Sequence, residues 1–116
     1  MNEELFKGRT KRLALDIIEL IESLPRSRTA DVIVRQLLRS GTSVGANYRA
    51  ACRGKSKADV ISKLAIVEEE ADETIYWIEL LIESKIIEAS RVNSLLKETN
   101  EIVAMVVASI KTLRRQ

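Results

Sequence analysis

The sequence predicts an all-α protein in which one domain, residues 1–116, forms an antiparallel up-and-down four-helix bundle. Aliphatic residues recur at helical spacing in four segments, about 3–24, 28–53, 57–84 and 88–114. Pro25 is the only proline, and aromatic residues make up only 3% of the chain, so the core must be aliphatic. Four long helices joined by short connections are typical of such a bundle.

The first segment has a single apolar face. The residues that share it are Leu13, Ile17, Leu20, Ile21 and Leu24. Pro25 ends this helix, because the residue before a proline is pushed out of helical geometry. Ser27 or Thr29 can cap the next helix, with Asp31 in its first turn.

The second segment contains two glycines, Gly41 and Gly45, which raises the question of whether it is a basic loop or a helix. At about 100° per residue, five arginines fall within an arc of about 80°. They are Arg28, Arg35, Arg39, Arg49 and Arg53. The opposite arc holds Ile33, Leu37, Gly41, Val44, Tyr48 and Ala51. A loop would not keep this register, so we expect one helix whose glycines allow a neighbouring helix to approach closely.

The third segment opens with a capping-box pattern, Ser56 to Asp59, just after Gly54. Its expected core face is Ile61, Leu64, Val67, Ala71, Ile75, Ile78 and Ile82. A second apolar face of Ile66, Trp77 and Leu80 predicts a subunit interface, with partial burial at a bundle edge as the alternative. The fourth segment carries Val92, Leu95, Leu96, Thr99, Ile102, Val103, Val106, Ile110 and Leu113 on its apolar face.

Charge is distributed unevenly along the chain. Residues 26–63 hold nine basic residues and two acids, a net charge of +7, whereas residues 64–101 have a net charge of −7. The arginine stripe, extended by Lys55 and Lys57, therefore has two interpretations. It contacts the phosphates of a nucleic acid, or it forms structural ion pairs with the acids of the third helix.

The residue types argue against an enzyme. Histidine, the commonest general base and metal ligand, is absent from the sequence. Cys52, the only cysteine, faces the apolar side of its helix and is expected to be an inert thiol. The acids Glu68, Glu69, Glu70, Asp72 and Glu73 point in different directions, so we expect no metal site. No cofactor motif, signal peptide or membrane-spanning stretch is present, so we expect a cytoplasmic protein with no cofactor.

The stretch SVGANYRAACRGKSKADVISKLAIVEEEADETIYWIELL, residues 43–81, strongly resembles the 23S rRNA intervening-sequence (S23 ribosomal protein-like) family of small bacterial four-helix bundles. The resemblance implies a ring-shaped homopentamer. Among the relatives, the accessory variability determinant of diversity-generating retroelements is a basic pentamer that binds nucleic acid and a reverse transcriptase. Arg39, Ser43, Asn47, Glu70 and Glu73 match polar positions of the family signature, without an implied catalytic role.

These observations lead to two hypotheses for function. In the first, a non-enzymatic homo-oligomer binds RNA or DNA through its arginine stripe. In the second, the ring is a scaffold or adaptor for a protein partner such as a reverse transcriptase, and the arginines form structural ion pairs. The SVGANYRAA motif differs from the form typical of the rRNA-embedded members, so the resemblance does not imply a ribosomal role.

Overall fold

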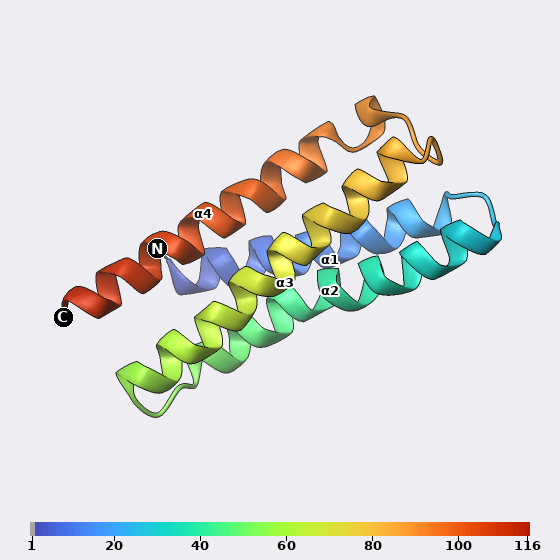
Figure 1. The fold of residues 1–116 in the computed structure, drawn as a ribbon. Helices are drawn as coiled ribbons and strands as arrows, with labels where there is room; N and C mark the ends of the chain where they lie inside the picture. Colours follow the sequence, from blue (N-terminus) through green and yellow to red (C-terminus); the bar gives the residue numbers. More distant parts are fainter. Residues whose placement is uncertain (1) are drawn as a thin grey trace.

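The computed structural model describes residues 2–116 as four α-helices and one short 3-10 helix. The helices are α1 (Glu3–Glu22), α2 (Arg28–Cys52), α3 (Lys57–Glu83) and α4 (Asn93–Arg115), with the 3-10 helix η1 at Ala89–Arg91. Consecutive helices run in opposite directions along a rod of 47 × 21 × 21 Å (Figure 1). The predicted all-helical, four-helix class is confirmed.

Side-chain caps fix where the first three helices begin. The side-chain oxygen of Asn2 accepts a hydrogen bond from the Leu5 backbone N–H, and Ser56 does the same for Asp59. At the start of α2 the cap is Ser27, which accepts from Ala30 at 3.0 Å, so the alternative Thr29 lies inside the helix. Each such cap stabilises a helix by about 1 kcal/mol.

The fourth helix begins at Asn93, five residues after the expected start. Lys85, which follows the C-cap Ser84 of α3, takes a left-handed conformation (φ 64°). The backbone N–H of Ile86 then donates to the Leu81 carbonyl, and that of Lys85 to the Ile82 carbonyl, which is the Schellman pattern. The chain crosses to α4 through η1, so the apolar residues of this connection are buried outside any α-helix.

The core follows the expected faces of α2 and α4 and shifts on α3. All six residues of the apolar arc of α2 are buried. On α3 the buried residues are Leu64, Val67, Ala71, Thr74, Ile78 and Leu81. Ile61, Ile75 and Ile82, expected in the core, are only partly buried. Thr74 is buried in place of Ile75, with its hydroxyl in hydrogen bonds to the buried Ser40 hydroxyl of α2 at 3.0 Å and to the Glu70 carbonyl at 2.8 Å.

The α1–α2 seam is tight. A methyl group on Gly41 would overlap Ile17 Cδ1, and one on Gly45 would lie 3.2 Å from Thr10 Oγ1. Both contacts come from α1, so the two glycines let its backbone approach α2 closely. Neither glycine has a positive φ, so close approach rather than an unusual backbone conformation accounts for them.

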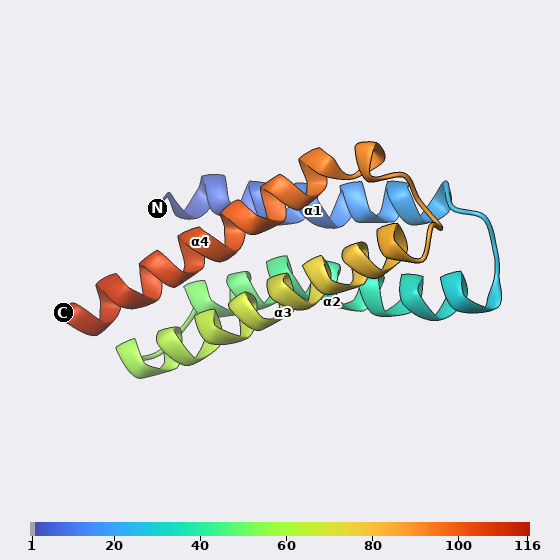
Figure 2. The same cartoon turned by 45° about the horizontal axis from the view of Figure 1, so that its top comes forward.

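The α1–α4 seam is loose. Figure 2 shows the C-terminal half of α4 diverging from the N-terminal half of α1. The two helices are linked where the Arg9 guanidinium donates to both Glu98 carboxylate oxygens, at 2.9 and 2.7 Å, and to Glu101 at 3.3 Å. Beyond this clamp a groove opens between them. Along residues 2–116 no helix combines the length and apolarity that crossing a bilayer requires.

Candidate nucleic-acid interface

The arginine stripe lies along the outer surface of α2. All five of its guanidinium groups belong to exposed residues. Arg28 and Arg53 are separated by about 37 Å of helix, at 1.5 Å per residue. Arg28, Arg35, Arg49 and Arg53 form no ion pair with any residue that the structure describes. Two of these free charges lie near each end of the helix.

Arg39, in the middle of the stripe, is held by α3. Its guanidinium donates to Glu73 at 2.7 Å and to Glu70 at 3.3 Å. The hydrogen bonds to Glu70 and Glu73, in that order, raise the pKa of Arg39. The Glu70 side chain is only 16% exposed and its second oxygen, Oε2, is buried without a hydrogen-bond partner. The ion-pair interpretation therefore describes Arg39, while the other four arginines of the stripe form no ion pair within the described residues.

The two lysines expected to extend the stripe are exposed beyond the end of α2. The Lys55 side chain forms no ion pair within residues 2–116, while its backbone N–H donates to Asp59. Lys57 donates from Nζ to the Gln116 carbonyl at 2.6 Å. Lys55 is therefore a free positive charge at this end, and Lys57 is partly engaged.

The family-signature positions fall into two groups. Arg39, Glu70 and Glu73 meet in the ion-pair cluster described above. Ser43 and Asn47 lie one turn apart on α2, where Asn47 Nδ2 donates to the Ser43 carbonyl at 2.9 Å. Among residues 2–116 no three metal-ligating side chains converge.

The second apolar face of α3 is partly covered by the protein itself. Trp77 and Leu80 pack at the edge of the core, and the indole N–H of Trp77 is buried without an acceptor. Ile66 is 39% exposed, and the neighbouring Tyr76, which packs edge-on against Trp77, is 52% exposed. The edge-burial alternative thus describes Trp77 and Leu80, whereas Ile66 and Tyr76 present apolar surface to solvent.

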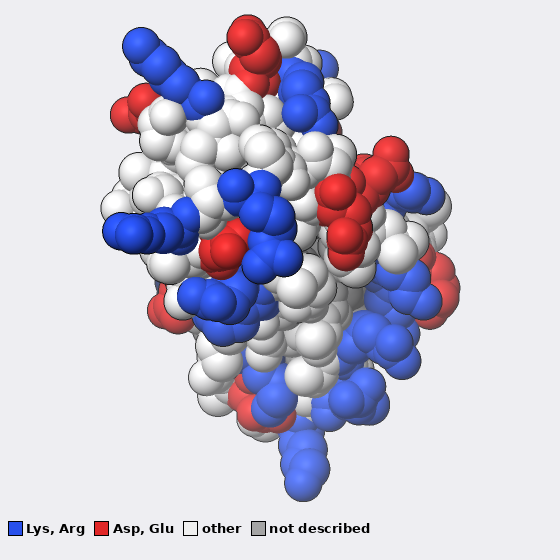
Figure 3. Space-filling view, turned by 90° about the vertical axis from the view of Figure 1, so that its right-hand side faces the viewer, with Lys and Arg blue, Asp and Glu red and all other residues white. Residues whose placement is uncertain are grey.

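The sequence alone did not indicate that α1 adds positive charge beside Arg49. Lys7 and Lys11 line a groove of about 600 Å³ between α1 and α2, opposite Arg49. Lys7 is paired with Glu3 and Glu4, while Lys11 is exposed and unpaired within the described chain. The contact of Thr10 with Gly45 sets how α1 is aligned along α2. The spacing of residues within α1 alone does not reveal this alignment. Figure 3 shows basic side chains also spread over the end that carries the α1–α2 connection.

Comparison with known proteins places the chain in a family. The model of the 23S rRNA-intervening sequence protein family matches residues 6–108. The chain belongs to this family. It is also similar, at 38% identity and a TM-score of 0.88, to the solved structure of a protein of unknown function from the S23 ribosomal protein family of Bacteroides thetaiotaomicron. That similarity covers 96% of this chain and 99% of the other. No curated protein matches the sequence.

Proposed function

We propose that the protein is a non-enzymatic, ring-forming homo-oligomer that binds RNA or DNA through the free arginines of α2. The supporting observation is that Arg28, Arg35, Arg49 and Arg53 are exposed and unpaired within residues 2–116, although acids are abundant on α3. Guanidinium groups spaced along one helix fit a run of phosphates. Such contacts give binding that depends on salt and little on sequence.

Arg39 does not take part in this binding. Its guanidinium is engaged by two carboxylates, so contacting a phosphate would leave Glu70 and Glu73 without their cation. The proposed interface therefore has two parts, Arg28 with Arg35 and Arg49 with Arg53, and Lys11 and Lys55 extend the second part.

Assembly into a ring, proposed as a pentamer, would multiply this interface. The exposed Ile66 and Tyr76 beside Trp77 are the proposed subunit contact on α3. Linked copies raise the effective concentration of each further contact, so a ring binds a long nucleic acid far more tightly than one subunit does. Light scattering should give five times the 13.1 kDa chain mass. A monomer at micromolar concentration would refute the ring.

Charge reversal tests the interface. Arg35→Glu combined with Arg53→Glu should leave the melting temperature and the assembly nearly unchanged, since neither arginine has an ion-pair partner to lose. Binding to duplex DNA or RNA should fall sharply, and the slope of log affinity against log salt should flatten by roughly one unit per lost contact. Lys97→Glu with Lys111→Glu on α4 changes the net charge equally and is the matched control.

The control separates a local interface from general charge attraction. If both double variants bind nucleic acid equally weakly, the stripe has no special role and the proposal fails. If the arginine variant loses stability instead of binding, its arginines are structural.

A second candidate is an adaptor that binds a protein such as a reverse transcriptase. The observation that favours it is that the aromatic ring of Tyr76 is exposed on α3, because aromatic residues are enriched where proteins meet. Tyr76→Ser should then abolish partner binding while leaving nucleic-acid binding and subunit mass intact. A change in subunit mass would assign this surface to self-assembly.

A further inference from the structure

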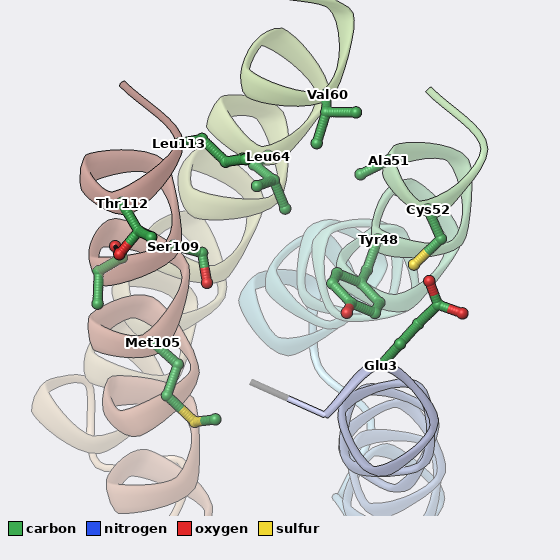
Figure 4. Close-up of a pocket in the computed structure, with 11 residues that line it drawn as sticks. Glu3, Tyr48, Ala51, Cys52, Val60, Leu64, Met105, Ser109, Thr112 and Leu113 are labelled. Atoms are coloured by element: carbon green, nitrogen blue, oxygen red, sulfur yellow. Dashed lines mark hydrogen bonds between the residues drawn. The ribbon is translucent and has the colours of Figure 1, made fainter. Parts of the chain in front are cut away.

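The loose seam between α1 and α4 contains an apolar groove of about 610 Å³, distinct from the arginine stripe. All four helices contribute to it, and Figure 4 shows Tyr48, Leu64 and Ser109 directed into the space between them, with the Glu3 carboxylate beside the Cys52 sulfur. The apolar part of the lining is Ala51, Val60, Leu64, Met105, Ala108 and Leu113. Small-molecule sites typically occupy roughly 300–1,000 Å³, so the groove has the size of such a site.

Tyr48 brings a hydrogen-bonding group into this apolar surface. The residue is only 5% exposed, and its ring packs edge-on against Phe6 with 4.6 Å between the centroids. Its hydroxyl lines the groove and makes no hydrogen bond to a nitrogen or oxygen atom of residues 2–116. The hydroxyl offers one hydrogen-bond donor and acceptor in a wall that is otherwise mainly apolar.

The ionisable groups around the groove determine which sign of charge a ligand can carry. Burial, and then the neighbouring Cys52 thiol, raise the pKa of Tyr48, and burial raises the pKa of Cys52, so both groups are neutral. Glu3 is the one charged residue in the described lining. Its carboxylate lies 3.5 Å from Lys7, which it shares with Glu4 at 3.6 Å, so this group of three carries a net negative charge.

Among the described residues, the inner end of the groove offers no free cation either. The Arg9 guanidinium lies 3.1 Å from the sulfur of Met105, but it is bonded to both Glu98 and Glu101. One cation between two carboxylates again leaves a net negative charge. An anionic ligand would meet like charge at both ends, whereas a cation would be attracted.

We infer that this groove binds a small amphiphilic organic cation. The apolar body of the ligand lies against the walls supplied by α3 and α4. A polar atom of the ligand pairs with the Tyr48 hydroxyl, and its ammonium group lies beside Glu3. A second copy of the chain or a partner helix in the same groove would exclude this ligand, so both are outcomes that the experiment distinguishes.

Three matched probes test the inference: phenylbutylamine, the neutral phenylbutanol and the anionic phenylbutyrate. Each is titrated into the protein while the methyl signal of Met105, which lines the groove, is followed by NMR. We expect saturable binding, with the amine about two- to fivefold tighter than the alcohol, since exposed ion pairs contribute little. The carboxylate should bind most weakly. Glu3→Gln should remove the preference for the amine.

Variants locate the binding. Tyr48→Phe removes only the hydroxyl and should weaken binding about three- to tenfold, the value of one hydrogen bond. Ser109→Trp fills the groove and should abolish binding, whereas Ala104→Trp, on an exposed part of α4 outside the groove, should not. Tyr48→Phe keeps the test decisive if the larger substitution disturbs folding.

Several results would overturn the inference. They are the absence of binding at millimolar probe, stronger binding of the carboxylate, and equal binding to Tyr48→Phe. A subunit mass that changes in Ser109→Trp and not in Ala104→Trp would show that a second copy covers the groove. Probe binding that survives Ser109→Trp would place the site elsewhere.

Discussion

The first helix forms two very different seams within the same bundle. Against α2 it packs closely at Gly41, where an added methyl group would overlap Ile17, and at Gly45, where one would lie 3.2 Å from Thr10, although a surface groove of about 600 Å³ runs beside this contact. Against α4 it meets a polar clamp, centred on Arg9, and then a mainly apolar groove lined in part by Tyr48. The tight seam stabilises the fold through close packing, so adding one methyl group there changes the free energy of unfolding. The loose seam leaves apolar surface and polar groups available to a ligand.

The largest expected effect concerns the tight seam. Gly41→Leu places a large side chain where Ile17 already lies, and both residues are buried. Overpacking of this kind costs roughly 1–3 kcal/mol or more, so the free energy of unfolding in urea should fall by at least that amount. An unchanged value would mean that α1 can move away freely and that the seam is not tight.

A smaller substitution at the same position should also destabilise the protein, but by less. Gly41→Ala gains helix propensity of up to about 1 kcal/mol but must displace Ile17, so we expect a net destabilisation of about 1 kcal/mol. Gly8→Ala is the matched control, because no atom lies within 4 Å of its added methyl group and it should be stabilising. If both alanine variants are more stable than the wild type, Gly41 is not needed for close packing and only lowers helix propensity.

The clamp of the loose seam is expected to matter less. Arg9→Leu removes the bidentate ion pair with Glu98. The side chains of Arg9 and Glu98 are 31% and 33% exposed. Screening by solvent limits the loss to about 0.5–1 kcal/mol, and high salt should shrink it further. Urea denaturation at low and high salt measures both effects. If Arg9→Leu lowers the free energy of unfolding by more than Gly41→Leu does, the α1–α4 seam contributes more to stability than the α1–α2 seam, contrary to our expectation.

The smallest effect tests a site outside both seams, at the start of α3. The ion pair with Lys63 at 2.6 Å, and then the N–H of Lys55 at 3.0 Å, lower the pKa of Asp59. A lowered pKa gives stability that is present above the unfolded pKa of about 4 and is lost as the pH falls below it. The melting temperature of the wild type should therefore exceed that of Asp59→Asn near neutral pH and converge with it in acid. A constant difference would show that the charge of Asp59 is unimportant.

The sequence was most predictive for features that depend on the residue spacing within one helix. The arc opposite the arginines of α2 is buried as expected, because a 3.6-residue period needs no knowledge of neighbours. The start of α4 was placed too early because Ile87 and Val92 continue an apolar pattern through a non-α-helical connection. The third helix ends at Glu83, two residues before Lys85, which takes a left-handed conformation. A glycine at the position of Lys85 would have been recognised in the sequence as a helix end.

The site was less predictable because it depends on how helices meet. That Arg39 pairs with α3 while Arg35 does not is set by the register between α2 and α3. The groove beside Tyr48 arises from the divergence of α4, which leaves no mark on the spacing of apolar residues. Long-range packing determined which of the charged and polar residues are free.

The central claim is that the free arginines of α2 bind nucleic acid, and a salt series on the wild-type protein tests it most directly. Fluorescence anisotropy of a labelled DNA duplex would be measured between about 50 and about 200 mM salt. Four phosphate contacts per chain predict a slope of log affinity against log salt of roughly −4 or steeper. No binding at the lowest salt, or an affinity independent of salt, would contradict the claim.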